Sequence, residues 1–364
     1  MSGHEAARVS ASPSSIGALL ERALAQRMKG DLAGAVASLD EVLAADPRNF
    51  LALLSKGALV ERLSGERPAA DWYRRALAVA PPQAMLPANL APPLARARQV
   101  ADIYTRALED HLLAAVASER ASFAGEDLER FDEALAIYSG RAEVYQQKPM
   151  LLHYPRLPAI PFYDRSLFPW LEMLEAATDV IRGELEPLLA SRFESFVPYI
   201  DYPPGHPVDQ WAELNHNRRW SSFFLWRDGV RQDGACALCP RTAELLAGLP
   251  LADQPGYAPT AMFSVLAAKT HIPPHTGSAN TRLVGHLPLI LPGPARFRVG
   301  NVTRKWRMGQ AWVFDDTIEH EAWNGADQPR TILIIDLWNP FLSRAERALV
   351  SAMMTARQAF EAAG

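Results

Sequence analysis

The second half of the chain carries a series of short strand-like segments separated by turns, and this series limits the possible fold more than any other feature. The segments cover residues 220–227, 261–268, 281–291, 295–299, 311–314 and 331–338. Several short strands at such spacing predict a β-sandwich or a barrel. One amphipathic helix, over about 171–192, precedes the first of them, and helical spacing returns after about Ser343.

The first half of the chain is rich in alanine and leucine with helical spacing from residue 16 to about 82, and again from 91 to about 122. It contains a weak repeat at offsets of 34 or 35 residues. The matching pairs are Gly30 and Gly65, Ala35 and Ala70, and Pro47 and Pro81. This period resembles that of the tetratricopeptide repeat, whose helical hairpins stack on one another. We expect either a groove for a protein partner or, with only two repeats, a helical cap that packs or dimerises.

These patterns predict an α+β protein with four parts. They are a disordered tail over 1–15, a tetratricopeptide-like helical domain over 16–135, a strand-rich domain over 136–345 and a C-terminal helix over 346–364. The net charge of −4 does not indicate a nucleic-acid partner. The chain has no apolar run of about 18 residues and no secretory signal, so we expect a cytoplasmic protein with no membrane partner.

The two cysteines of the chain, Cys236 and Cys239, form a single CxxC in the segment GACALCP. A zinc ribbon needs a second such pair, and no thioredoxin-like strand pattern precedes this one. The interpretation we favour is two ordinary reduced thiols, and a local disulfide or redox pair is the alternative.

Two polar residues interrupt the apolar segment 281–291 on the same face. Strand alternation turns Arg282, Val284, His286, Pro288 and Ile290 to one side, and Leu283, Leu287, Leu289 and Leu291 to the other. Burying a charge and an imidazole without partners is costly, so this face is expected to line a cavity for an anion or a metal.

Two further histidines are expected in turns beside predicted strands, His275 before the segment 281–291 and His320 in VFDDTIEHEAW. They can converge at a barrel mouth, where neutral imidazole nitrogens suit iron(II). By spacing alone, a histidine in a turn is more often a surface or hydrogen-bonding residue.

Longer motifs carry a stronger signal. The segments HTGSANTRLVGHL, GQAWVFDDTIEHEAWN and RTILIIDLWNP, in that order, resemble the aspartyl/asparaginyl beta-hydroxylase family. The upstream segments YPRLPAIPFYDRSLFPW, LNHNRRWSSFFLWRDG and CPRTAELL also resemble its catalytic domain. The likeness covers roughly residues 140 to 345. It implies a double-stranded β-helix (cupin or jelly-roll) fold and a dioxygenase that uses Fe(II), with 2-oxoglutarate and O2 as co-substrates.

The resemblance also implies roles for individual residues. His275 and His320 would hold the iron, His286 would contact the C1 end of 2-oxoglutarate, and Ser264 and Arg330 would hold its distal carboxylate. A guanidinium offers two donors in one plane that match a carboxylate. On the substrate side, Arg282 would anchor a carboxylate, and Trp220 and Arg219 would line the groove.

Gly277 stands two residues after His275, where most enzymes of the wider oxygenase class carry the carboxylate of an HxD or HxE triad. The family that the sequence resembles shares this departure. Two protein ligands then leave room for water, which an acid outside the coordination sphere can orient, and Asp316 is our candidate. Asp316 can equally cap its own turn.

The expected activity is hydroxylation of a C–H bond, first of all the β-carbon of Asp or Asn in a peptide. A free amino acid, another small molecule or a lipid is the alternative substrate. Two other classes of protein stay open: a zinc hydrolase using His275, His286 and His320, and a scaffold with an inactive barrel.

A group of cations follows in the second half of the strand-rich domain. It predicts either a basic mouth of the cavity that attracts acidic groups or phosphate, or a solvated strand edge. Its members are Arg296, Arg298, Arg304, Lys305 and Arg307.

Overall fold

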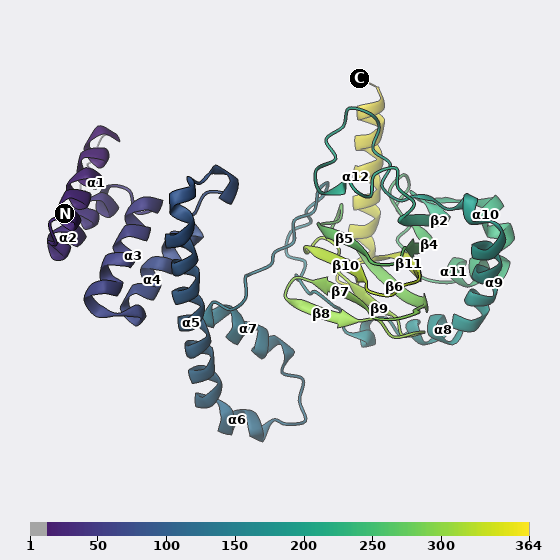
Figure 1. The fold of residues 1–364 in the computed structure, drawn as a ribbon. Coiled ribbons are helices and arrows are strands. Elements are labelled where there is room, and N and C mark those ends of the chain that lie inside the picture. The colour runs from purple at the N-terminus through teal and green to yellow at the C-terminus, as the bar shows by residue number, and fades with distance from the viewer. Residues whose placement is uncertain (1–12, 364) are drawn as a thin grey trace, which may run out of the picture. The chain divides into compact units, whose positions relative to one another are not determined.

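The computed structural model describes residues 13–363, and these form two compact units divided between Glu143 and Val144. The first unit is helical, and the second combines two β-sheets with helices (Figure 1). Most of the tail predicted for 1–15 lies outside the described residues, whereas Pro13 and the two serines after it form the start of the first helix.

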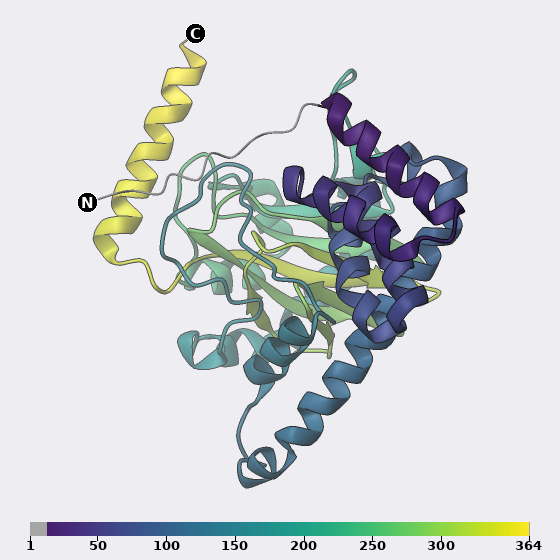
Figure 2. The same cartoon turned by 90° about the vertical axis from the view of Figure 1, so that its left-hand side faces the viewer.

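The first unit is a stack of α-helices in which each helix from α1 to α5 packs on the next along the chain (Figure 2). Its α-helices are α1 (Pro13–Met28), α2 (Leu32–Ala45), α3 (Phe50–Ser64), α4 (Glu66–Ala78), α5 (Ala91–Ala115), α6 (Ala117–Ser122) and α7 (Glu129–Ser139). Two short 3-10 turns, Gln83–Met85 and Ala88–Leu90, connect α4 to α5. The helical stretch predicted over 91 to about 122 consists of α5 and α6, and α7 packs on α5.

The predicted repeat corresponds to equivalent positions in two of these hairpins. Gly30 and Gly65 precede α2 and α4 with φ angles of 82° and 92°, a backbone region that favours glycine. Ala35 and Ala70 are both fully buried, and their small side chains let the helices approach closely. The spacing in the sequence therefore reflects a repeated helical hairpin.

The second unit contains two antiparallel sheets. The larger has the order β1-β2-β4-β11-β6-β9, with β3 paired to β2, and the smaller has the order β5-β10-β7-β8. The strands are β1 (Val197–Pro198), β2 (Trp220–Arg227), β3 (Val230–Arg231), β4 (Ala261–Leu266), β5 (Thr270–His275), β6 (Arg282–Ile290), β7 (Ala295–Val299), β8 (Val302–Lys305), β9 (Trp312–Phe314), β10 (His320–Asn324) and β11 (Arg330–Trp338). From β4 to β11 the chain crosses repeatedly between the two sheets, which is the predicted double-stranded β-helix.

The larger sheet is covered on both faces. Helices α8 (Leu171–Ala176), α9 (Thr178–Ser191), α10 (Asp233–Leu238) and α11 (Pro240–Ala247) pack on one face (Figure 1). A second apolar cluster, including Ile272, Phe297 and Ile332, fills the space between the sheets. Each large apolar side chain that is fully buried in this way contributes about 1.5–3 kcal/mol to the free energy of folding.

The alternation predicted along β6 is correct except at its end. Leu283, Leu287 and Leu289 pack toward the helices, and Val284 faces the smaller sheet. Ile290 and Leu291 contact the opposite clusters from those predicted. A shift in register against β11 at Thr331/Ile332 inserts an extra residue here, so the alternation is inverted beyond it.

The prediction that His275 and His320 lie in turns is wrong. His275 is the last residue of β5, and His320 is the first residue of β10. Strand β5 was missed because it contains Pro273 and Pro274, which are rare in central strands. It tolerates them because it forms the edge of the smaller sheet.

The C-terminal helix α12 (Arg344–Ala362) begins with a capping box between Ser343 and Glu346. Its buried residues, Val350 and Met354, pack against Trp338 at the end of β11. Among residues 13–363, none of the helices has the length and apolar character needed to cross a bilayer.

Candidate functional site

His275 and His320 lie directly opposite each other on the paired strands β5 and β10. Their ring centroids are 4.0 Å apart. Nδ1 of His275 lies 2.8 Å from the carbonyl oxygen of Pro273, and Nδ1 of His320 lies 3.0 Å from that of Ile318. A carbonyl only accepts, so each Nδ1 carries the proton and donates it, which leaves each Nε2 with a free lone pair.

Burial keeps both imidazoles neutral. It lowers the pKa of His275 to about 4 and is the main reason why the pKa of His320 falls well below its usual value, with a further contribution from neighbouring His275. Neutral imidazole is the form that binds a metal ion. Within residues 13–363, no group of three or more His, Cys, Asp or Glu side chains is arranged to hold a metal. A metal here would therefore take two protein ligands and complete its coordination from elsewhere.

The carboxylate of Asp316 occupies the space beside Gly277. A Cβ atom built on Gly277 would lie within 2.6 Å of Cγ and both carboxylate oxygens of Asp316. The backbone N–H of Gly277 also donates to the carbonyl oxygen of Asp316 at 2.6 Å. The carboxylate that an HxD motif would supply from position 277 is thus replaced by one that reaches the same place from position 316.

Asp316 belongs to a buried charge cluster with Arg282 and Asp336. One nitrogen of Arg282 donates to Asp336, and the other lies 3.0 Å from Ser278 Oγ and 3.4 Å from Asp316 Oδ2. Burial raises the pKa of Asp316 to about 7, although Arg282 opposes this shift. Oδ1 of Asp316 is buried without a hydrogen-bond partner among the described residues. The guanidinium of Arg282 is therefore already shared between two carboxylates.

Asp336 was not predicted from the sequence. It lies in RTILIIDLW, where a carboxylate interrupts an apolar strand just as Arg282 interrupts β6. Its other oxygen accepts a hydrogen bond from the backbone N–H of Thr260 at 2.8 Å. A charged residue within an apolar strand was the signal that indicated Arg282, and the same signal could have indicated Asp336.

Arg330 is 1% exposed, and no carboxylate of the described residues pairs with it. Its Nη1 reaches only the carbonyl oxygen of Ser264, at 3.4 Å, and its Nε has no partner within the described residues. The guanidinium lies over the ring of Trp306, 4.9 Å from its centroid, and burial lowers the pKa of Arg330 to about 9. A buried cation without a counter-charge is costly, so this position requires an anion.

Ser264 and His286 lie near Arg330 on the strands that flank β11. Ser264, on β4, pairs with Ile332, and its fully buried Oγ accepts from Trp220 Nε1 at 3.1 Å. His286, on β6, has a buried Nδ1 without a partner in the described part of the chain, and burial holds its pKa well below the usual value. Both side chains therefore have hydrogen-bonding capacity left for a ligand.

One cavity of about 500 Å³ collects nearly all of the predicted site residues. The predicted residues in its lining are Trp220, Ser264, His275, Arg282, His286, Asp316, His320 and Arg330. Aromatic residues that were not predicted complete one wall: Tyr199 stacks on Trp220 with ring centroids 4.2 Å apart, and Trp211 contacts the ring of His275 at 5.0 Å.

Arg219 does not line this cavity. Its side chain bonds to Thr270 Oγ1 at 3.3 Å and to the carbonyl oxygen of Lys269 at 3.4 Å. Arg219 lies in the turn just before β2, and these bonds hold its side chain outside the cavity that Trp220 lines. The two cysteines are buried free thiols, and burial raises the pKa of Cys239 to about 12.

The strand-rich unit, which contains this cavity, is similar to known proteins. Residues 175–340 match the family model described as aspartyl/asparaginyl beta-hydroxylase. The chain is 35% identical over 198 residues to the ornithine lipid ester-linked acyl 2-hydroxylase of Rhizobium tropici, covering 53% of this chain and 66% of that protein. It is 38% identical over 156 residues to the aspartyl/asparaginyl beta-hydroxylase of Homo sapiens, covering 42% of this chain and 20% of that protein.

Among solved structures, a cupin domain of an XRE family transcriptional regulator from Enterobacter cloacae matches 22% of this chain and 82% of its own, with 12% identity and a TM-score of 0.20. The family match includes every residue of the cavity lining except Met150. Residues 175–340 of this chain therefore belong to the aspartyl/asparaginyl beta-hydroxylase family, as a domain that follows an N-terminal helical region.

Proposed function

We propose that this protein is an Fe(II)- and 2-oxoglutarate-dependent dioxygenase that hydroxylates a C–H bond. The observation that carries the proposal is the unpaired, buried guanidinium of Arg330 in the same cavity as two neutral imidazoles with free Nε2 atoms. The Nε2 atoms would bind a metal, and the guanidinium would bind the second carboxylate of an oxo-acid that chelates this metal. A zinc hydrolase would leave the buried charge of Arg330 without a function.

The residues present fit iron and its co-substrate. His275 and His320 would hold the metal, and the backbone carbonyls bonded to their Nδ1 atoms fix the ring orientations. Bound iron(II) supplies the oxidising chemistry: 2-oxoglutarate and dioxygen are converted to succinate and carbon dioxide while one oxygen atom enters the substrate C–H bond.

The chain's own residues bind and orient the reactants. Arg330 neutralises the distal carboxylate of 2-oxoglutarate, Ser264 adds a hydroxyl donor, and His286 contacts the C1 end. Asp316, whose Oδ1 has no hydrogen-bond partner among the described residues, would orient a water molecule in the cavity. The aromatic wall of Tyr199, Trp211 and Trp220 excludes bulk water from the reacting carbon.

The β-carbon of Asp or Asn in a peptide is the first substrate candidate, because the chain is similar to an aspartyl/asparaginyl beta-hydroxylase. A lipid acyl chain is the second, and two observations favour it. The match to an ornithine lipid ester-linked acyl 2-hydroxylase covers 198 residues, against 156 for the human aspartyl/asparaginyl beta-hydroxylase. In addition, Asp316 and Asp336 already neutralise Arg282, which weakens its predicted use as the anchor of a substrate carboxylate.

Anaerobic titration tests the oxygenase proposal. Iron(II) and 2-oxoglutarate added together should produce a weak visible charge-transfer band, and admission of air should release succinate. Changing His275 or His320 to Ala should abolish the band and metal retention. The control is His153→Ala, since His153 lies outside the cavity lining. An unchanged band in both histidine variants would contradict the proposal.

A substrate panel then separates the two candidates. Succinate release should be accelerated by either Asp- and Asn-containing peptides or by acyl-ester lipids in detergent, and mass spectrometry should locate the added oxygen. If neither class accelerates succinate release while uncoupled turnover persists, both substrate assignments fail but the oxygenase proposal stands. If no succinate forms under any condition, the scaffold interpretation gains support.

A further inference from the structure

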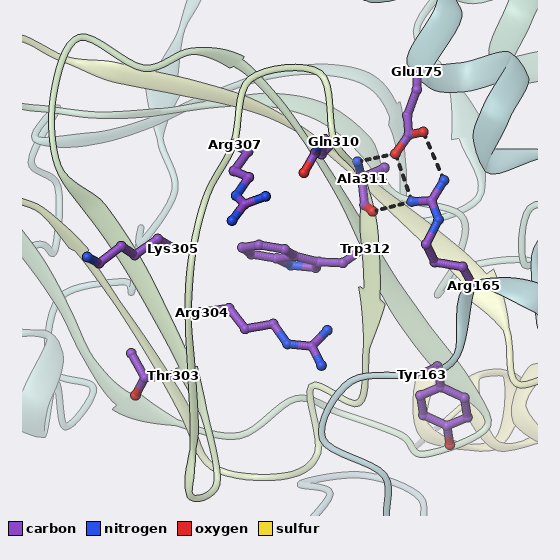
Figure 3. Close-up of a pocket in the computed structure, with 10 residues that line it drawn as sticks. All are labelled: Tyr163, Arg165, Glu175, Thr303, Arg304, Lys305, Arg307, Gln310, Ala311 and Trp312. Atoms are coloured by element: carbon purple, nitrogen blue, oxygen red, sulfur yellow. Dashed lines mark hydrogen bonds and ion pairs between the residues drawn. The ribbon is translucent and has the colours of Figure 1, made fainter. Parts of the chain in front are cut away.

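The cations that the sequence analysis placed near the mouth of the cavity lie elsewhere. None of the five lines the cavity of the candidate site, so they do not form a basic mouth for it. Three of them line a second cavity of about 740 Å³ beside β8, which Figure 3 shows: Arg304, Lys305 and Arg307. Arg298 lines neither cavity, and its side chain instead contacts the two residues that flank His320 in the chain.

The guanidinium of Arg298 joins the carboxylates on either side of His320. Its Nε donates to Glu321, its Nη2 donates to Glu319 at 2.8 Å, and its Nη1 donates to the carbonyl oxygen of Gly300 at 2.9 Å. The backbone N–H of Gly300 donates in turn to the carbonyl oxygen of Glu319 at 2.9 Å. Only 16% of the Arg298 side chain and 12% of the Glu321 side chain are exposed. These four residues, which we call the Arg298 cluster, tie both neighbours of His320 to the end of β7.

The Arg298 cluster acts from the outer face of the smaller sheet. Phe297 packs inward in the apolar layer between the sheets, so Arg298 beside it points outward. In β10, His320 lines the cavity and Ala322 packs inward, so the residue between them, Glu321, points outward. Arg298 and Glu321 lie directly opposite each other in the pairing of β7 with β10, where side chains interact most closely. Arg298 therefore influences His320 through the backbone of β10.

The strand on the other side of β10 gives His320 weaker support. The pairing of β10 with β5 shifts in register between His320 and Ala322, and the two prolines of β5 have no N–H to donate there. Glu321 is linked to His271 of β5 at 2.8 Å, but 43% of that histidine side chain is exposed. The pairing with β7, in contrast, continues without a shift from His320 to the end of β10. The position of His320 is therefore determined mainly from the side on which Arg298 lies.

We propose that Arg298 is a positioning residue that holds His320 in the geometry required for metal binding, an inference that rests on the proposed function. A metal with only two protein ligands depends strongly on the placement of each. Groups that fix a metal ligand from outside the coordination sphere typically account for about 10- to 100-fold in metal affinity.

The competing interpretation is an ion-pair network that stabilises the sheet without affecting the metal site. Coulomb attraction separates positioning from a simple charge effect. Loss of Arg298 removes a positive charge near the metal ligands and leaves Glu319 and Glu321 in place, which by charge alone would strengthen the binding of a metal cation. Positioning of His320 predicts the opposite sign, because a displaced ligand weakens the binding.

Titration of the metal-free whole chain with cobalt(II), in the presence of 2-oxoglutarate and followed by the visible bands of the bound metal, tests the proposal. The wild type should bind at one saturable site. Arg298→Met keeps the apolar stem and should raise the Kd for cobalt about 10- to 100-fold and shift the visible bands. The matched control is Arg296→Met, on the same face of β7. The Arg296 guanidinium lies 4.3 Å from the ring centroid of Trp323, so this variant should bind cobalt like the wild type.

The remaining outcomes separate the possible failures. Equal or tighter cobalt binding by Arg298→Met would overturn the proposal, and so would an equal weakening in Arg296→Met, since that indicates a general effect on β7. Near-ultraviolet circular dichroism checks that each variant is folded.

Arg298→Lys decides the question if Arg298→Met does not fold. It keeps the charge but has one ammonium group in place of three donating nitrogens, so its Kd should exceed that of the wild type, and wild-type affinity together with unchanged bands would overturn the proposal. Absence of cobalt binding by the wild type would contradict the proposed function itself. Normal binding by the wild type with the same affinity in the Arg298 variants would contradict this inference alone.

Discussion

The packing of Asp316 against Gly277 leads to a sharp prediction for the variant Gly277→Ala. The new Cβ would lie within 2.6 Å of three atoms of the Asp316 carboxylate, whereas ordinary contact begins at 3.4 Å. The nearest atom, Oδ2, would lie 1.9 Å from the new Cβ and must move by about 1.5 Å to reach 3.4 Å, which strains its 3.4 Å contact with Arg282. Forced movement in a packed interior costs about 1–3 kcal/mol, and a weakened buried ion pair adds to this cost.

We expect Gly277→Ala to lower the free energy of unfolding of the strand-rich unit by about 2–3 kcal/mol. Urea denaturation followed by tryptophan fluorescence measures this change, with Gly234→Ala as the control. No atom lies within 4 Å of a Cβ built on Gly234, which is exposed in helix α10. That variant should be neutral or slightly stabilised, because alanine is the better helix former.

A double-mutant cycle with Asp316→Ala isolates the proposed cause. Asp316→Ala removes all three atoms in the way, so Gly277→Ala should cost at least about 1 kcal/mol less in that background than in the wild type. An equal cost in the two backgrounds would show that something other than this carboxylate excludes a side chain from position 277, and the reasoning would fail.

Three further predictions concern charge and burial. Arg330→Met should raise the melting temperature measured by thermal unfolding, because an unpaired buried charge is removed. The same variant should raise the KM for 2-oxoglutarate, measured by succinate release, about 10- to 100-fold, because it loses a charge-assisted hydrogen bond of about 1.5–3 kcal/mol. The pKa of Asp316 is raised to about 7, so the folded protein holds a proton that the unfolded chain releases near about pH 4. Stability of the metal-free protein should therefore fall as pH rises from about 4 to about 7, and this fall should be smaller in Asp316→Asn. Burial raises the pKa values of Cys236 and Cys239, so both thiols should react slowly with a thiol reagent in buffer and rapidly in urea; fast labelling of the folded protein would contradict their burial.

Strand-like composition between turns located most strands of the larger sheet. The predicted ranges 220–227 and 295–299 coincide with β2 and β7. Strand β10, which is central in the smaller sheet, was not predicted. Strand β5 could not be found in this way, since its two prolines are acceptable only at an edge, and position in a sheet is not encoded in local sequence.

The site was predicted unevenly for a similar reason. Motif order indicated residues from six strands, β2, β4, β5, β6, β10 and β11, that meet in one cavity. It did not indicate that Asp336 shares Arg282, because that pairing depends on the register between β6 and β11, where Asp336 lies opposite Val284. Arg219 was expected in the groove from its place beside Trp220, but it lies in the turn before β2, where its side chain bonds to Thr270 and Lys269.

The two sheets contribute different parts of the cavity. His275 and His320 come from the smaller sheet, whereas Ser264, His286 and Arg330 come from the larger one. The separation between a metal on one sheet and an anion on the other is therefore determined by the thickness of the apolar layer that contains Ile272, Phe297 and Ile332. Substitutions in that layer, none of them at a polar residue, could adapt the cavity to a longer or shorter co-substrate while both binding groups keep their own geometry.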